Sequence, residues 1–244
     1  MDADSRHTFG RGVLEGGFHL LDVLSRFDGG AGLSELARQA QLPKATTHRL
    51  LDQLLALGAV ERRGQRYAVG PLLRRLGSSW QPEPALAAAA REPIKALAAL
   101  TTTVVGVSVL HRRQTLVVSG TRGVLTDFPL PSPGDVLADS TAAARLLQLE
   151  ANPPDREPPA GYSPVAWRAA HREYARSGSM LVEHEEVVPS VSCAASPVHD
   201  ADGRVVGVVS ALALRRSLPA GVVELTVRAA REVSRNLGRD RLPA

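Results

Sequence analysis

The 244-residue sequence predicts an α+β protein with two domains. Three observations lead to this prediction. Apolar residues recur at helical spacing in the first third of the chain, Gln81-Pro82-Glu83-Pro84 interrupts the pattern, and short apolar stretches of strand type follow between two helical segments. Helices at the ends of a mostly antiparallel sheet are the arrangement that this order of elements favours.

The first domain is expected at residues 12–70, after a polar arm at 1–11 that we expect to be disordered. A first helix is predicted at 12–27. Its apolar stripe is formed by Leu14, Phe18, Leu21 and Leu24 at helical spacing and is widened by Leu20, Val23 and Phe27. Asp28-Gly29-Gly30 ends this helix.

Two further helices are predicted on either side of the turn Gln41-Leu42-Pro43. Ser34 is a good N-cap for the shorter helix. Pro43 suits the first position of the longer helix, which is expected to end at Gly58. The residues that this helix is expected to bury are Leu50, Leu51, Leu54 and Leu57.

A short hairpin follows, with strands at 59–62 and 66–69 and a turn at 63–65. A linker helix is then expected at 71–82. The order of helix, turn, helix and hairpin is typical of a winged helix-turn-helix, a module that binds DNA.

Reading of the major groove needs a helix whose first turns expose hydrogen-bonding side chains. In the longer helix Arg49 can pair with guanine in bidentate fashion, while Thr46 or Thr47 meets phosphate or a thymine methyl group. His48 is either partly exposed or packed against the domain. Arginines at the hairpin tip suit phosphate or minor-groove contact. The predicted DNA-contacting residues are Ser34, Lys44, Ala45, Thr46, Thr47, Arg49, Arg62, Arg63 and Arg66.

The charge distribution agrees with a DNA-binding first domain. Residues 1–80 carry 11 Arg and Lys against 8 Asp and Glu, a net charge of +3, whereas residues 81–244 carry 18 against 17, a net charge of +1. A phosphate-binding module is expected to hold most of the positive charge. A winged helix used for protein contacts stays an alternative, because a net charge of +3 is modest.

The second domain is expected at 83–244 and begins with an Ala-rich helix at 85–101. A Pro-rich loop is predicted at 152–164, between helices at 140–150 and 165–177. Strands are predicted at 104–111, 114–120, 124–129, 180–187, 191–198 and 204–213, and a last helix at 219–238.

The composition limits the chemistry of the chain. The single cysteine, Cys193, excludes an internal disulfide and a multi-cysteine zinc site, and it fits a reducing compartment. The N-terminal segment lacks the apolar core of a signal peptide, and no apolar run is long enough to span a membrane. We therefore expect a cytoplasmic protein.

Two parts of the sequence resemble the IclR family of bacterial transcriptional regulators. They are LSELARQAQLPKATTHRLLDQLLALGAVER, followed by RYAVGPLLRRLG, and VVPSVSCAASPVHDADGRVVGVVSALAL near the C-terminus. The resemblance implies a winged helix-turn-helix, a linker helix and a C-terminal effector-binding domain of GAF-like α/β fold with a central, mostly antiparallel sheet. It also implies a repressor that binds palindromic operator DNA as a dimer or tetramer.

The resemblance also implies a small-molecule pocket on the sheet, near Thr141, Ala142, Ala143, Glu183, Cys193 and Ser210. Alanines stand where the family usually has glycines at the start of the helix at 140–150, and Leu212 stands where a hydroxyl is common. Backbone N–H groups at that helix start would still bind an anion, so the expected effector is a carboxylate or an aromatic acid in a less polar pocket. Cys193 and Ser210 can equally be ordinary strand residues, and Glu183 a solvated carboxylate at the sheet edge.

The sequence supports a catalytic site or a metal site less well than a DNA-binding regulator. The sequence has neither a G-x-S-x-G elbow nor a Walker loop, so we expect no enzyme and no cofactor. Three interpretations are weaker than plain strand and turn structure: a Cys193 nucleophile with His184 or His199, a metal site at 184–186, and a calcium loop at 200–203. The sequence therefore predicts a ligand-responsive transcriptional regulator. The alternatives are a sensor that acts through protein contacts and an enzyme that uses the C-terminal pocket.

Overall fold

The computed structural model describes residues 12–78, 80–123, 130–159, 161–178, 180–185 and 189–239. The chain divides into two compact units at residues 1–80 and 81–244, and each has its own hydrophobic core. The expected arm at 1–11 and the expected strand at 124–129 lie outside the described residues. No helix in the described part of the chain is long and apolar enough to cross a membrane.

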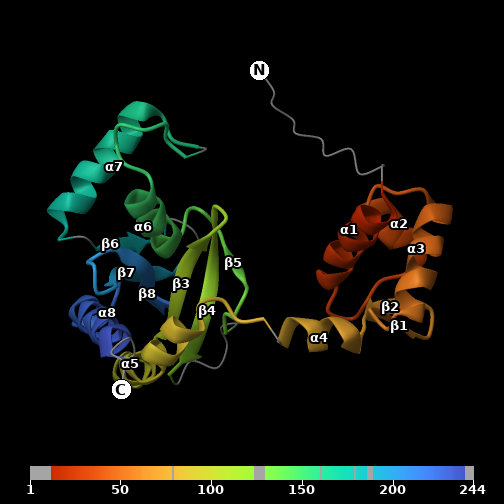
Figure 1. Ribbon diagram of the computed structural model, residues 1–244, viewed down its shortest axis with the longest axis horizontal. Coiled ribbons are helices and arrows are strands. Elements are labelled where there is room, and N and C mark those ends of the chain that lie inside the picture. Colours follow the sequence, from red (N-terminus) through yellow and green to blue (C-terminus); the bar gives the residue numbers. More distant parts are fainter. Residues whose placement is uncertain are drawn as a thin grey trace. The chain divides into compact units, whose positions relative to one another are not determined.

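The N-terminal unit has the order of elements expected for a winged helix-turn-helix (Figure 1). Three helices are followed by an antiparallel hairpin and a fourth helix. The bounds are Val13–Ser25 (α1), Leu33–Gln39 (α2), Lys44–Ala56 (α3), Val60–Arg63 (β1), Arg66–Val69 (β2) and Pro71–Ser78 (α4). The core forms where the first three helices meet the hairpin, around the fully buried Leu20, Leu36 and Leu51.

The buried face of α1 differs from the one expected from its periodicity. Leu21 and Leu24 are buried as expected, together with Leu20, but the side chains of Leu14 and Phe18 are 74% and 64% exposed. The spacing rule does not tell which of two adjacent apolar stripes faces the core when a helix is apolar around much of its circumference. The unit therefore leaves an apolar surface on the N-terminal half of α1.

Three helix ends also differ from the sequence prediction. Gly32, and not Ser34, is the N-cap of α2, and Ser34 lies exposed in the first turn. Pro43 is the N-cap of α3 rather than its first residue. Leu57 lies just beyond α3 and is 66% exposed, because Gly58, with a φ of 73°, turns the chain toward β1.

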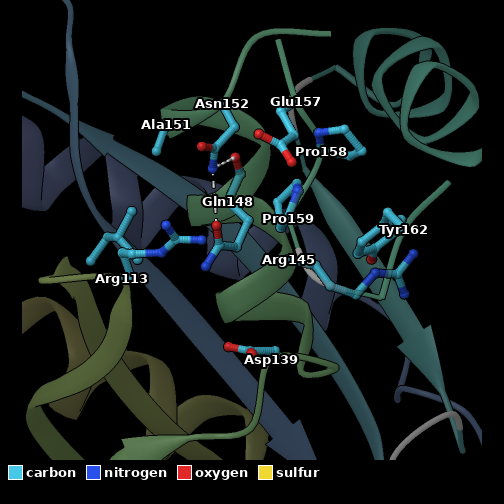
Figure 2. A pocket seen from close by; sticks show the side chains of 11 residues that line it. Arg113, Asp139, Arg145, Gln148, Ala151, Asn152, Glu157, Pro158, Pro159 and Tyr162 are labelled. Carbon is cyan, nitrogen blue, oxygen red and sulfur yellow. Dashed lines mark hydrogen bonds between the residues drawn. The ribbon is translucent and has the colours of Figure 1, made fainter. Parts of the chain in front are cut away.

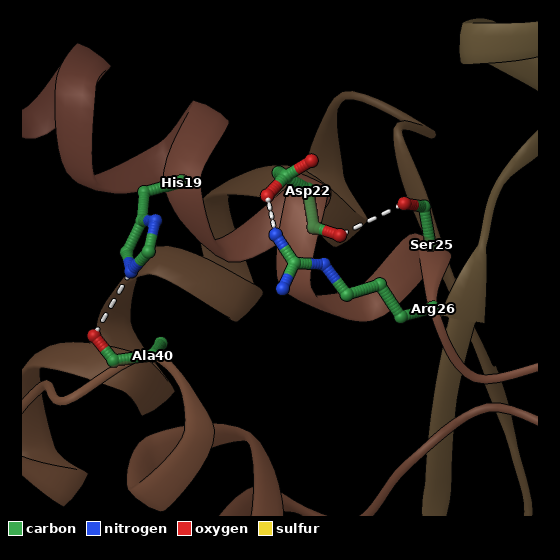
Figure 3. Close-up of polar contacts among 5 residues, drawn as sticks. All are labelled: His19, Asp22, Ser25, Arg26 and Ala40. Atoms are coloured by element: carbon green, nitrogen blue, oxygen red, sulfur yellow. Dashed lines mark hydrogen bonds and ion pairs between the residues drawn. The ribbon is translucent and has the colours of Figure 1, made fainter. Parts of the chain in front are cut away.

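Polar contacts hold the connections on both sides of α2. The His19 ring atom Nε2 lies 3.1 Å from the carbonyl oxygen of Ala40, at the end of α2 (Figure 3). The Arg66 guanidinium donates to the carbonyl oxygen of Gly30 at 2.8 Å and so joins the hairpin to the α1–α2 connection. Only glycine fits there, since a Cβ on Gly30 would lie 2.3 Å from the Tyr67 carbonyl oxygen. These contacts tie α1 to the end of α2 and the hairpin to the α1–α2 connection.

The C-terminal unit is built on one six-stranded antiparallel sheet with strand order β5-β4-β3-β8-β7-β6. This sheet confirms the predicted α+β class. β5 has only two residues, too few to show a periodicity, and it is absent from the sequence prediction. The strands are Val104–His111 (β3), Gln114–Arg122 (β4), Val136–Leu137 (β5), Leu181–His184 (β6), Ser192–His199 (β7) and Val205–Ala213 (β8). The helices are Pro84–Thr101 (α5), Ala142–Ala151 (α6), Pro164–Arg176 (α7) and Val222–Arg239 (α8).

Helices cover both faces of this sheet (Figure 1). α5 and α8 pack on one face, and α6 packs on the other, with the buried Trp167 of α7 in the same core as α6. Side chains along β8 alternate between these cores, because successive residues of a strand point to opposite faces. Val209 and Ala211 lie under α5 and α8, whereas Val208 and Leu212 face α6.

The turn between α2 and α3 contains a residue, Gln41, whose replacement by glycine should stabilise the unit. Gln41 has a φ of 54°, in the left-handed region, which costs a non-glycine residue about 1–2 kcal/mol. Because glycine also gains entropy when the chain unfolds, we expect Gln41→Gly to raise the free energy of unfolding of this unit by about 0.5 kcal/mol. Slower hydrogen exchange of the α2 and α3 amides in the full chain would measure this gain.

The matched control for this prediction is Gln53→Gly, at an exposed helical position in α3. It is expected to lower the same free energy by about 1 kcal/mol, since glycine is unfavourable inside a helix. Faster exchange in both variants would contradict the interpretation of Gln41.

Candidate DNA interface and ligand cavity

The first turns of α3 present a mixed polar and basic surface. Lys44, Ala45, His48 and Arg49 are exposed and follow one another at helical spacing on the outer side of the helix. The sequence left the placement of His48 open, and the structure puts it on this surface. Its ring atom Nδ1 lies 3.0 Å from a carboxylate oxygen of Asp52, one turn further along, and both side chains are more than half exposed.

Thr47, which was expected to contact DNA, is fully buried in the unit. Its hydroxyl donates to the carbonyl oxygen of Pro43 at 3.1 Å, inside the first turn of α3. Thr47 precedes Leu50 and Leu51 by three and four residues, so it shares their core-facing side. The prediction for Thr47 is therefore wrong, while Thr46 is half-buried beside it.

The three wing arginines lie at the hairpin, as the sequence predicts, but each has a partner within the unit. Arg62 donates to the carbonyl oxygen of Gly64 at 3.1 Å, and Arg63 forms an ion pair with Glu61. Arg66 donates to the carbonyl oxygen of Gly30, as described above. Exposed pairs of this kind contribute little to stability, so Arg62 and Arg63 can exchange them for a phosphate at small cost. Arg66 also has a structural role, because its hydrogen bond joins the hairpin to the α1–α2 connection.

A cavity of about 230 Å³ lies on the face of the sheet that α6 covers. Five of the six residues expected at an effector pocket line it: Thr141, Ala143, Glu183, Cys193 and Ser210. The sixth, Ala142, is buried at the start of α6. Leu212 also lines the cavity, and it stands where a hydroxyl is common in the family that the sequence resembles. These residues come from β6, β7, β8 and the start of α6.

The register of the sheet explains why residues distant in sequence meet at this cavity. Cys193 of β7 is the direct partner of Glu183 on one side and of Leu212 on the other. Ser210 of β8 faces Gly106 of β3 in the same way. Since alternate residues share a face, Gly106 and Ser108 also line the cavity, and the sequence analysis missed both. The strand alternation in 104–111 was the signal that would have identified them.

The polar end of the cavity is formed by Glu183 and the N-terminus of α6. The carboxylate of Glu183 is 4% exposed and accepts a hydrogen bond from the Ala142 backbone N–H at 3.0 Å. A negative charge is favourable there, because the helix dipole is positive at its start. The sequence analysis expected these N–H groups to hold an anionic ligand, whereas a carboxylate of the protein already uses the Ala142 donor. The interpretation of Glu183 as a solvated residue is also wrong.

Burial changes the chemistry of the Cys193 thiol. Desolvation, followed by the nearby Glu183 charge, raises the pKa of Cys193 to about 12. A thiol with such a pKa stays neutral at ordinary pH and is a poor nucleophile. Cys193 therefore acts as an apolar wall of the cavity.

A larger and more open cavity of about 660 Å³ lies between α6 and the segment before α7 (Figure 2). Two arginines and two carboxylates, Arg113, Arg145, Asp139 and Glu157, line it among the described residues, so their charges balance. The Asn152 amide donates to the Gln148 carbonyl oxygen within this cavity. The balance of charge favours neither an anionic nor a cationic ligand.

Residues 200–203 form the turn between β7 and β8. The Asp200 carboxylate accepts hydrogen bonds from the backbone N–H groups of Asp202 and Arg204 at 3.0 and 2.9 Å. This arrangement is a hairpin turn, in agreement with the sequence prediction. Within the described ranges, three or more His, Cys, Asp or Glu residues are nowhere grouped as metal ligands would be.

The neutral Cys193 thiol gives a direct test of the cavity wall. At pH 8 only about one such thiol in ten thousand is ionised, so we expect iodoacetamide to label the folded chain far more slowly than it labels free cysteine. The extent of labelling is measured by mass spectrometry, and the same chain in urea is the control. Labelling of the folded chain at the rate seen in urea would show that Cys193 is not buried.

Comparison with known proteins identifies the N-terminal unit. Residues 13–64 match the family model of the IclR helix-turn-helix domain. Over 66 residues the chain is 39% identical to the transcriptional repressor IclR of Escherichia coli K12 and 41% identical to the acetate operon repressor of Salmonella typhimurium. These matches cover 26% of this chain and 24% of each repressor, so the chain matches about a quarter of the length of these relatives.

Solved structures share the fold over almost the whole chain. An IclR homologue from Microbacterium hydrocarbonoxydans in complex with 4-hydroxybenzoate has a TM-score of 0.72 at 19% identity, over 93% of this chain and 99% of that one. An IclR-type regulator from Alicyclobacillus acidocaldarius has a TM-score of 0.70 at 22% identity, over 93% and 98%. The N-terminal unit thus matches the IclR helix-turn-helix domain, and the chain shares its fold with these IclR-type structures.

Proposed function

We propose that the chain is a ligand-responsive repressor of transcription that binds palindromic operator DNA. The observation that carries this proposal is the exposed start of α3, where Lys44, His48 and Arg49 share one surface in an IclR-type helix-turn-helix domain. This is the part of a recognition helix that contacts base edges in the major groove. Curated relatives of the domain are repressors, which supports repression over activation.

In this proposal some residues of the interface contact bases and others contact phosphate. Arg49 reads a base, because its planar guanidinium can donate two hydrogen bonds to guanine. Lys44, at the start of α3, and the exposed Ser34 contact phosphate. Arg62 and Arg63 contact phosphate or the minor groove from the hairpin. Ala45 lies one turn before Arg49 on the same face of the helix. Its small side chain permits the helix backbone to approach the groove.

We also propose that operator binding requires self-association. The apolar surface of α1 supports this part of the proposal, since Val13, Leu14 and Phe18 are each more than half exposed. Contiguous apolar residues on a small domain commonly mark an interface. A symmetric pair of helix-turn-helix units would match the two halves of a palindrome. The charge of a single unit is modest, so a pair gives the tighter binding that an operator needs.

The cavity under α6 is proposed as the effector site. It is mostly apolar and lined by residues of all six strands and of the start of α6, and small-molecule sites are commonly clefts of this kind. The 4-hydroxybenzoate complex of a structural relative supports a small aromatic ligand for this fold. Control of DNA binding then requires that the ligand bind one arrangement of the assembly more tightly than the other.

Replacement of Arg49 tests the reading surface. We expect Arg49→Ala to lower the affinity for an operator selected from random duplexes about 10-fold or more, because a bidentate contact with guanine is lost. Fluorescence anisotropy with labelled duplexes measures this affinity. Arg231→Ala, an equal change of charge at an exposed position of α8, is the control. Unchanged operator affinity in Arg49→Ala would refute the assignment of α3 as the reading helix.

Introduction of negative charge on α1 tests self-association. Because Leu14 and Phe18 lie outside the core, the double variant Leu14→Glu, Phe18→Glu should fold normally. It should lose most of the preference for a full palindrome over a single half-site, as measured by anisotropy. Leu57→Glu, at a residue of similar exposure just beyond α3 in the same unit, is the control. If the double variant keeps the wild-type preference, the α1 surface is not the interface.

A further inference from the structure

His48 and Asp52 form a polar pair on the exposed side of α3, and the operator contacts proposed above give neither residue a role. His48 Nδ1 lies 3.0 Å from Asp52 Oδ2, and the two residues are one helical turn apart. Arg49, the proposed base-reading residue, is exposed directly beside His48. The pair therefore lies on the surface that is proposed to face the major groove.

The position of Asp52 on this surface is not explained by folding. Its side chain is 56% exposed, so it does not fill the core, and an exposed pair of this kind contributes little to stability. A carboxylate on a surface that approaches DNA also repels phosphate. We therefore looked for an effect of the carboxylate on the imidazole that it contacts.

The contact with Asp52 decides which nitrogen of a neutral His48 ring carries the proton. An ionised carboxylate only accepts hydrogen bonds, so the imidazole donates to it from Nδ1–H. The second nitrogen, Nε2, then has no proton and can only accept. His48 is 55% exposed, and Asp52 is its polar partner among the described residues. Nε2 is thus available to a base edge as an acceptor of fixed orientation.

An acceptor in the major groove distinguishes two bases from the other two. Cytosine and adenine present amino hydrogens there, at N4 and N6, whereas guanine and thymine present the acceptors O6 and O4. Arg49 is a donor and has the opposite preference, for guanine. His48 and Arg49 together would therefore place a donor and an acceptor next to each other on the reading surface.

We propose that His48 reads cytosine or adenine through Nε2, and that Asp52 is a positioning residue that fixes the tautomer and the orientation of the His48 ring. A carboxylate that orients a histidine in this way is a common arrangement in proteins. The inference rests on the proposed function, because it requires α3 to be the reading helix. It adds to that function one specificity-determining residue and the class of base that the residue recognises.

Replacement of the bases of one half-site, one at a time, tests the role of His48. Binding of the full wild-type chain to each duplex is measured by fluorescence anisotropy at pH 8, where histidine is ordinarily neutral. We expect one position at which cytosine or adenine is bound about 5-fold more tightly than guanine or thymine, since one hydrogen bond is at stake. His48→Ala should remove this preference and leave the preferences at other positions unchanged. The proposal is overturned if no position depends on His48.

Two substitutions of Asp52 test its positioning role. Asp52→Ala should weaken the preference at the His48 position, because the ring is no longer oriented. Asp52→Asn should preserve it, since the amide oxygen still accepts from Nδ1–H. Glu92→Ala, at an exposed carboxylate paired with Lys95 in α5, removes the same charge outside the DNA-binding unit and is the matched control.

The two Asp52 variants also separate positioning from other roles of the carboxylate. If Asp52 acts only by repelling phosphate, both variants bind all duplexes more tightly by the same factor and the base preference stays as in the wild type. If Asp52 itself reads a base, Asp52→Asn changes the preference even in the His48→Ala background. Either result would overturn the positioning role.

Arg49→Ala distinguishes this inference from the proposed function. A wild-type chain that selects an operator and depends on Arg49, but not on His48, would overturn the inference and leave the proposed function intact. A wild-type chain that selects no duplex sequence at all would overturn both.

Discussion

The C-terminal unit depends on a sheet that is buried on both faces. Strand residues alternate between the core under α5 and α8 and the side covered by α6, so each strand contributes to both. The α5 and α8 side is filled with Val, Leu and Ala side chains. The α6 side carries smaller or polar residues at Gly106, Cys193 and Ser210, and the space that they leave is the cavity. The cavity is thus a consequence of how one face of the sheet is filled.

The start of α6 joins this sheet face to the electrostatics of the cavity. A helix N-terminus offers backbone donors and a partial positive charge to whatever lies in front of it. Here the edge strand β6 supplies the anion itself, because Glu183 points to the same face as Cys193 and reaches Ala142.

In the N-terminal unit the helical period of α3 separates the residues that pack in the core from those that are exposed. Thr47, Leu50 and Leu51 lie on one side and fill the core, while Lys44, His48 and Arg49 lie on the other and stay exposed. The contacts of His19 with Ala40 and of Arg66 with Gly30 lie at the connections on the two sides of α2, in the same unit.

The sequence by itself determined the order of most elements, the winged helix-turn-helix and a mostly antiparallel sheet, because these follow from periodicity, turn residues and caps that act over a few positions. It missed the two-residue strand β5. It also identified the cavity residues Glu183, Cys193 and Ser210 through the family resemblance. Only the tertiary structure decided that Thr47 is buried, that Leu14 and Phe18 are exposed, and that Glu183 occupies the start of α6. The physical reason is that burial and long-range hydrogen bonds depend on which elements pack together, and local sequence spacing carries no information about those partners.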